Sequence, residues 1–220
     1  MIEENVKSLL SELERGNAFG EKVTLVAATK TRTPDEINRA LAAGIEDIGE
    51  NRVQEFLGKF DLIAGGRRHF IGRLQTNKVK YLVGKTFLIH SVDRDELAEE
   101  IERRSQAMGI STNILVQVNI GDETSKGGYH PKEAWAACLR LREKAGLTVK
   151  GFMAMLPVSD DENYLAGLCD EMRALYERAR AEDNNIEFLS MGMSSDWRLC
   201  LGHGANVIRL GTAIFGERHY

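Results

Sequence analysis

The chain has 220 residues, of which 43% are hydrophobic and 28% are charged, and its formal net charge is -4. This length suits one α/β domain, and the apolar content is enough to fill a sizeable core. The charges are spread along the sequence, and the largest basic cluster is the short run Arg67-Arg68-His69. A nucleic-acid-binding protein needs an extended basic face, so the composition argues against that class.

The cysteines, the histidines and the start of the chain narrow the class further. Three cysteines stand far apart, and the five histidines include no His-x-x-x-His pair, so no metal site is expected. The sequence begins Met1-Ile-Glu-Glu-Asn, without the apolar stretch of a signal peptide. No apolar run approaches the roughly 20 residues that span a bilayer. We expect a cytoplasmic protein without a membrane partner, in which Cys138, Cys169 and Cys200 are reduced and buried.

Strand and helix patterns alternate along the whole sequence. Residues 2–15 carry apolar side chains at helical spacing and predict an N-terminal helix. Eight short apolar or β-branched runs follow, and stretches of helical periodicity separate them. Each run predicts a strand; the runs are residues 23–29, 45–49, 69–72, 86–91, 113–119, 149–155, 187–191 and 206–210.

Helix-end signals support the intervening helices. Thr33 is placed as an N-cap, and Pro34 occupies the first helical position of a helix over 34–43. A helix over 93–108 stops before Gly109, a typical C′ glycine. Further helices are predicted at residues 131–145 and, as the longest, at 162–181.

This alternation predicts a single α/β domain over residues 1–220. Near-continuous apolar strands separated by helices form a parallel sheet that is covered on both faces. Eight such units in about 200 residues suit a closed (β/α)8 TIM barrel, with residues 2–15 as an extra N-terminal helix. An open doubly wound sheet is the alternative, but no Gly-x-Gly-x-x-Gly follows the first strand. No linker marks a second domain.

Lys30 is the most informative residue of the predicted barrel. It ends the first apolar run just before Pro34, which places one amine at the strand's carboxyl end, where this fold binds ligands. An amine among apolar walls and other cations loses its proton more easily and can attack a carbonyl. The alternative is a lysine that extends from a strand end into water. Other polar residues near strand ends are Glu50, Asn51, Gln75, Ser91 and Asn119.

The last two predicted strands favour the ligand-binding alternative. Gly192-Met-Ser-Ser195 and Arg209-Leu-Gly-Thr212 follow these strands and can expose backbone N–H groups and hydroxyls. This is the recurring phosphate site of the TIM barrel. Each glycine alone can simply make a tight turn. Two such loops opposite a strand-end lysine favour a phosphate site.

An amine that condenses with an aldehyde, opposite a phosphate site, indicates pyridoxal 5′-phosphate (PLP). Arg209 lies two residues before Gly211 and can point into the barrel mouth beside this cofactor. A guanidinium keeps its proton, so it would leave the pyridine nitrogen unprotonated and the cofactor a weak electron sink. A structural ion pair is the alternative role for Arg209.

Seven segments, in order over nearly the whole chain, resemble the pyridoxal phosphate homeostasis protein family, a relative of the alanine racemase N-terminal barrel. The segments are Val26-Ala-Ala-Thr-Lys-Thr31, Ile48-Gly-Glu-Asn-Arg-Val-Gln-Glu55, His69-Phe-Ile-Gly-Arg-Leu-Gln-Thr-Asn-Lys78, Val116-Gln-Val-Asn-Ile-Gly-Asp-Glu-Thr-Ser-Lys-Gly127, Gly151-Phe-Met-Ala-Met155, Leu189-Ser-Met-Gly-Met-Ser194 and Val207-Ile-Arg-Leu-Gly-Thr-Ala-Ile-Phe-Gly216.

The resemblance implies a set of site residues. Lys30 would form a Schiff base with PLP, and Arg209 would meet the ring nitrogen. The remaining implied residues are Ser194, Gly211 and Thr212 at the phosphate and Asn51 near the cofactor. One position departs from the family pattern.

Where relatives commonly carry a second lysine, two positions after the Schiff-base lysine, this chain has Arg32. A role for an amine at that position in passing the cofactor on is therefore in doubt. Lys126 matches the family pattern and is either a second acceptor for the aldehyde or a solvated loop lysine.

Three functions compete: a PLP carrier, an amino-acid racemase and a Schiff-base aldolase. Racemisation needs proton donors on both faces of a carbanion, and racemase relatives take the second donor, a tyrosine, from another domain. Here Tyr81, Tyr129, Tyr164, Tyr176 and Tyr220 fall mostly in predicted helices or loops, and none ends a strand.

An aldolase needs a carboxylate beside a lysine that lies deeper in the barrel. Glu50 is the only strand-end candidate, and it can equally anchor a helix.

We therefore expect a non-catalytic protein of intracellular PLP homeostasis, without catalytic residues, that buffers or delivers PLP. A weak PLP-dependent racemase is the alternative. PLP-dependent apo-enzymes are candidate recipients, and the resemblance implies a monomer or weak dimer.

Overall fold

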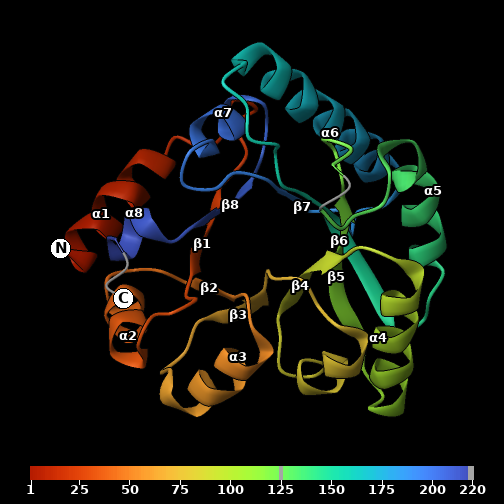
Figure 1. The fold of residues 1–220 in the computed structure, drawn as a ribbon, viewed down its shortest axis with the longest axis horizontal. Coiled ribbons are helices and arrows are strands. Elements are labelled where there is room, and N and C mark those ends of the chain that lie inside the picture. Colours follow the sequence, from red (N-terminus) through yellow and green to blue (C-terminus); the bar gives the residue numbers. More distant parts are fainter. Residues whose placement is uncertain (124–125, 218–220) are drawn as a thin grey trace.

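The computed structural model describes residues 1–123 and 126–217 as a closed barrel of eight parallel strands (Figure 1). Each strand pairs with the next in sequence, and the last pairs with the first, so the predicted TIM barrel is confirmed and the open sheet is wrong. The strands are β1 Thr24–Ala28, β2 Asp47–Glu50, β3 Arg67–Phe70, β4 Leu88–Val92, β5 Thr112–Val118, β6 Leu147–Ala154, β7 Phe188–Ser190 and β8 Val207–Leu210.

Helices surround the strands (Figure 1). The α-helices are α1 Ile2–Leu13, α2 Pro34–Ala42, α3 Val53–Lys59, α4 Asp95–Ala107, α5 Pro131–Arg142, α6 Glu162–Glu182, α7 Trp197–Gly202 and α8 Thr212–Phe215, and the 3-10 helices are η1 Phe60–Leu62 and η2 Thr76–Tyr81. The predicted helices at 34–43, 93–108, 131–145 and 162–181 are confirmed with small shifts at their ends. Between β3 and β4 only η2 forms. Val79 is its one buried residue, so this segment lacks the apolar stripe of an α-helix.

The predicted N-terminal helix is α1, which lies beside α8 from the other end of the chain (Figure 1). Its buried side chains recur every three or four residues and face the barrel; they are Ile2, Val6, Leu9 and Leu13. Asn5 Nδ2 donates to the carbonyl of Ile214 in α8 at 3.0 Å. This contact stabilises α8, which follows the last strand.

Local end signals act as the sequence predicts. The Thr33 hydroxyl accepts from the Glu36 backbone N–H, and the Glu36 carboxylate accepts from the Thr33 N–H, so the two form a capping box at the start of α2. Gly109 follows α4 with φ 67°, as a C′ glycine should. Cys138, Cys169 and Cys200 are buried free thiols.

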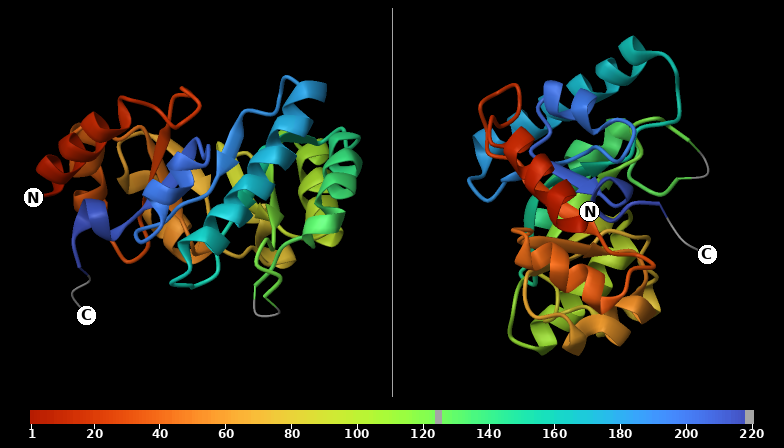
Figure 2. Two further views of the ribbon diagram at one scale, coloured as in Figure 1. Left: turned by 90° about the horizontal axis from the view of Figure 1, so that it is seen from above. Right: turned by 90° about the vertical axis from the view of Figure 1, so that its left-hand side faces the viewer.

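The carboxyl ends of the strands open on one side of the barrel. In the left view of Figure 2 the segments after β5 and β6 and the end of α8 lie along the same lower edge of the molecule. Residues 1–123 and 126–217 include no helix that is both long enough and apolar enough to cross a membrane.

Candidate functional site

A cavity of about 190 Å³ at the carboxyl ends of the strands brings together all six residues predicted for the site. They are Lys30, Asn51, Ser194, Arg209, Gly211 and Thr212. The same cavity is also lined by Ala28, Arg32, Ile71, Met155 and Met193. Closure of the barrel explains the meeting, because β1 pairs directly with β8 and Val26 lies opposite Arg209.

Lys30 lies two residues beyond β1 in a tight turn and is half-buried. The Arg32 N–H donates to the Thr29 carbonyl at 3.1 Å, and Thr31 adopts φ 65°. Left-handed backbone is uncommon for a β-branched residue and costs on the order of 1–3 kcal/mol. The Thr31 N–H donates to Glu55 Oε2 at 2.8 Å, so α3 holds the turn in this conformation. The strained residue therefore lies directly beside the cavity lysine.

Arg209 points from β8 into the barrel and is buried. Its guanidinium donates to the carbonyls of Ser190 and Ala154, each at 3.0 Å, and to the Ser190 hydroxyl. In the described chain these partners are all neutral oxygens, so the structural ion pair considered for Arg209 does not form. Burial lowers the pKa of Arg209 to about 10, which leaves it cationic at neutral pH.

Asn51 offers the cavity an unused acceptor. Its Oδ1 is buried and has no hydrogen-bond partner in the described chain. Burying such an oxygen is costly unless a ligand or water satisfies it. The neighbouring Gly72 makes room for this segment, because a Cβ there would lie 2.1 Å from the Asn51 carbonyl oxygen.

The loops after β7 and β8 form the opposite end of the cavity. Gly211 caps α8, and its carbonyl accepts from the N–H groups of Ile214 and Phe215. The N–H groups that open a helix have no partner within it and can donate to an anion. The hydroxyls of Ser194 and Thr212 belong to exposed residues at the same end. Gly192, with φ 100°, makes a tight turn against Trp197.

The charged residues that line the cavity are all basic among the described residues. Lys30, Arg32 and Arg209 line it, and no described lining residue is acidic. The whole chain has a net charge of -4, so this is a local reversal. A small anion with an apolar body fits this cavity, because Ile71 and Met155 supply apolar walls.

Arg32, where the chain departs from the family pattern, holds two segments together. Its guanidinium donates to the carbonyls of Phe215, Gly216 and Glu217 and to Glu36. It also stacks over the Phe215 ring. These contacts tie the Lys30 turn to the end of α8. Arg32 therefore has a structural role that a lysine could fill only in part.

Lys126 is not among the described lining residues, although it contacts the residue that follows Met155 of the cavity wall. Its ammonium pairs with Glu123 and donates to the Leu156 carbonyl at 3.0 Å. The adjacent Ser125 lies outside the described residues. The contacts of Lys126 are those of a loop anchor, and it does not line the cavity.

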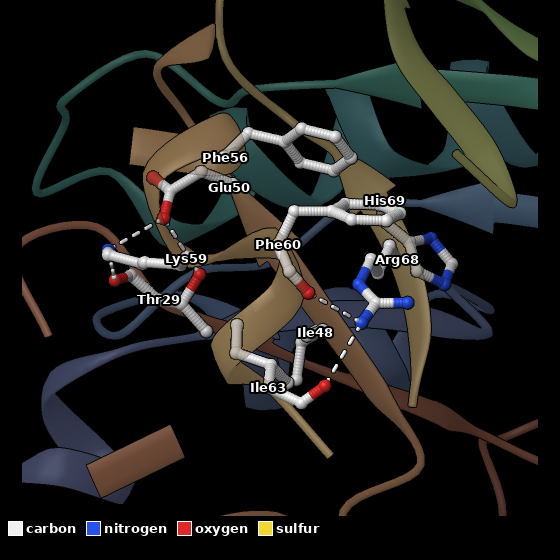
Figure 3. A pocket seen from close by; sticks show the side chains of 9 residues that line it. All are labelled: Thr29, Ile48, Glu50, Phe56, Lys59, Phe60, Ile63, Arg68 and His69. Carbon is white, nitrogen blue, oxygen red and sulfur yellow. Dashed lines mark hydrogen bonds and ion pairs between the residues drawn. The ribbon is translucent and has the colours of Figure 1, made fainter. Parts of the chain in front are cut away.

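Glu50 anchors a helix, as the sequence allowed. Its carboxylate accepts from Thr29 Oγ1 at 3.0 Å and from Lys59 Nζ at 2.9 Å (Figure 3). These residues border a void of about 20 Å³ under α3 and η1, where Arg68 donates to the carbonyls of Phe60 and Ile63. The void has room for about one water molecule and is no ligand site.

Several other polar residues near strand ends stay outside the cavity. The Asn119 amide donates to the carbonyls of Glu123 and Lys126, and Ser91 is buried without a partner in the described chain. Gln75, Tyr81, Tyr129, Tyr164 and Tyr176 are also absent from the described cavity wall. Tyr129 forms an isolated bridge with Val118 at the end of β5, and Tyr220 lies outside the described residues.

Polar residues inside the barrel were not predicted from the sequence to have a role. His69, His90 and Ser190 are buried and hydrogen-bonded to one another behind Arg209. The signal was present, because each falls within a predicted strand run whose alternate residues face inward.

Residues 2–219 match the family model for the alanine racemase N-terminal domain. The chain is 40% identical over 210 residues to a pyridoxal phosphate homeostasis protein of Aquifex aeolicus, which covers 94% of this chain and 92% of the relative. PipY of Synechococcus elongatus, solved with PLP bound, superposes with a TM-score of 0.85 at 31% identity and covers 98% of this chain and 100% of its own.

An alanine racemase of Clostridium difficile superposes with a TM-score of 0.75 over 99% of this chain and 58% of its own. Its identity is 13%, so this likeness concerns the fold alone. The ordered sequence motifs, the closed barrel and the full-length matches agree. The chain belongs to the alanine racemase N-terminal domain family and, within it, to the pyridoxal phosphate homeostasis proteins.

Proposed function

We propose that this protein binds PLP in the cavity beside Lys30 and serves intracellular PLP homeostasis by buffering or delivering the cofactor. The observation that carries the proposal is the cavity itself, with a half-buried lysine, two arginines and no acidic residue among its described lining. The PLP-bound relative PipY and the homeostasis proteins at 30–40% identity support it.

The cavity residues fit the parts of PLP. The Lys30 amine would bond to the aldehyde carbon as a Schiff base, and the aldehyde oxygen would leave as water. The hydroxyls of Ser194 and Thr212, with the backbone at Gly211, would hold the phosphate. Arg209 would meet the ring nitrogen as a cationic donor, and the unpaired Asn51 Oδ1 would gain a partner nearby.

The same residues favour a carrier over an enzyme. PLP supplies an electron sink when bound, and racemisation would also need acid–base groups on both faces. Lys30 is the only Lys, His, Cys, Tyr, Asp or Glu among the described cavity residues. A donor that keeps its proton at the ring nitrogen also weakens the sink. We propose no catalytic residue, with weak racemisation as the most that one base would support.

We also propose that residues 1–220 work as one domain in the cytoplasm, as a monomer or weak dimer. PLP-dependent apo-enzymes are the proposed recipients of the cofactor.

Replacing the lysine tests the proposal. Lys30→Ala should abolish the near-ultraviolet-to-visible absorbance of lysine-bound PLP while circular dichroism stays native. Lys7→Ala, at an exposed position on α1, is the matched control and should keep that absorbance. Full absorbance in Lys30→Ala would disprove the role of Lys30. Robust turnover of any L- or D-amino acid by the wild type would place the protein among the enzymes.

A further inference from the structure

A line of buried polar side chains crosses the barrel interior behind Arg209. The Arg209 guanidinium donates to Ser190 Oγ, which lies 3.0 Å from His90 Nδ1. His90 Nε2 lies 2.8 Å from His69 Nδ1, and His69 Nε2 lies 2.8 Å from Asp47 Oδ1. We call Asp47, His69, His90, Ser190 and Arg209 the interior network.

The interior network crosses the barrel interior and is buried along its length. Its residues come from β2, β3, β4, β7 and β8, and all five are buried. Strands β4 and β7 are not neighbours in the sheet, so the contact between His90 and Ser190 crosses the lumen. At the far end Asp47 Oδ2 accepts from the half-exposed Arg67 at 2.7 Å.

The Asp47 end of the interior network determines the direction of the hydrogen bonds when both imidazoles are neutral. A carboxylate only accepts, so His69 donates from Nε2 to Asp47 Oδ1. A neutral imidazole carries one N–H, so His69 Nδ1 accepts from His90 Nε2. His90 Nδ1 then accepts from the Ser190 hydroxyl, whose oxygen accepts from Arg209. The reverse order would require the ionised Asp47 carboxylate to donate a hydrogen bond.

The electrostatics agree with this order. Burial lowers the pKa of His69, and burial with the nearby His69 and Arg209 lowers the pKa of His90 well below its usual value. Burial raises the pKa of Asp47, but the hydrogen bonds from His69 and Arg67 outweigh it, so the carboxyl stays ionised. The charged or titratable groups along the line are Arg67, Asp47, His69, His90 and Arg209, with Cys200 and Asp196 near the arginine.

We infer that Asp47, His69, His90 and Ser190 are positioning residues for Arg209, joined in a one-way hydrogen-bond network that holds both imidazoles as neutral Nε2–H tautomers. The network keeps the guanidinium in one place and directs its remaining N–H groups to the cavity. It links the cation at the site, on β8, to the buried carboxylate of Asp47 on β2. The consequence for PLP rests on the proposed function, whereas the tautomers belong to the protein alone.

The tautomers can be measured on the protein without cofactor. Long-range ¹H–¹⁵N spectra at pH 7, assigned with single histidine variants, should show Nε2 protonated and Nδ1 unprotonated in both His69 and His90. An Nδ1–H tautomer or a cationic ring at either position would overturn the inference. The tautomers are read from the wild-type spectra, and the single variants serve only to identify the signals of His69 and His90.

A variant tests the effect on the site. Ser190→Ala removes the hydroxyl that joins Arg209 to His90, and Ser91→Ala is the matched control because Ser91 is also buried on a strand but has no partner in the described chain. Ser190→Ala should weaken PLP binding roughly tenfold or more and shift the absorbance maximum of bound PLP. Ser91→Ala should change neither.

The outcomes separate this inference from the proposed function. Wild-type affinity and spectrum in Ser190→Ala would overturn the inference while PLP binding stands. Failure of the wild type to bind PLP, with both Nε2–H tautomers present, would overturn the proposed function and leave the tautomers intact.

Discussion

At the cavity, the position of Lys30 could be predicted from the sequence, but the contacts around it could not. Lys30 was predicted from its place at a strand end, and the structure puts it in the wall of a cavity with two arginines. The strained φ of Thr31 was not predictable, because it depends on the carboxylate of Glu55 from another element. The same is true of Arg32, whose carbonyl partners lie more than 180 residues away.

The buried histidines predict how stability depends on pH. Their folded pKa values are lowered, so below the unfolded value of about 6.5 the unfolded chain binds protons that the folded one does not. Stability should therefore be full above that pH and should fall on acidification, by up to about 1.4 kcal/mol per pH unit for each histidine.

Urea unfolding at pH 7, 6 and 5 checks this slope. His90→Gln should lower the stability at pH 7 and also reduce the loss between pH 7 and pH 5. A wild-type stability that stays level or rises on acidification would contradict the lowered pKa values. If His90→Gln lost as much stability between pH 7 and pH 5 as the wild type, His90 would not contribute to the pH dependence.

At the scale of elements, the sequence pattern predicts the strands and the long helices and misses the shortest helices. All eight strands appear near the runs that predict them, because strands covered on both faces are rich in apolar residues. Strand β3 starts two residues early, at Arg67, since Asp47 and the Phe87 ring hold that side chain at the sheet. Helices α7 and α8 are too short to show a period, although α8 opens the proposed phosphate end.

Glycines where elements approach closely give a prediction at this scale. Gly72→Ala would place a Cβ 2.1 Å from the Asn51 carbonyl oxygen, and the backbone must move. We expect a loss of at least about 2 kcal/mol in the free energy of unfolding, together with weaker PLP binding. Gly58→Ala is the control, because Gly58 lies inside α3 with open space around it. This substitution should raise the free energy of unfolding by at most about 1 kcal/mol.

Urea denaturation and PLP titration measure both variants. Stability and affinity equal to those of the wild type in Gly72→Ala would show that Asn51 is not held by this close approach.

For the whole molecule, the order of the strands in the barrel determines which residues meet in the cavity. A barrel closed in sequence order must bring the first strand to the last, so the meeting of Lys30 with Arg209 was predictable from eight repeated units. The interior network was not predictable. Which inward residues touch across the lumen depends on the register of each strand pair, and short apolar runs leave that register open.

The central claim is that Lys30 carries PLP covalently in this barrel. The most direct measurement is borohydride reduction of the PLP-loaded protein, followed by proteolysis and mass spectrometry. We expect the reduced cofactor on the peptide that contains Lys30. Its recovery on a peptide with another lysine, such as Lys126, or on none, would show that Lys30 does not bind PLP covalently.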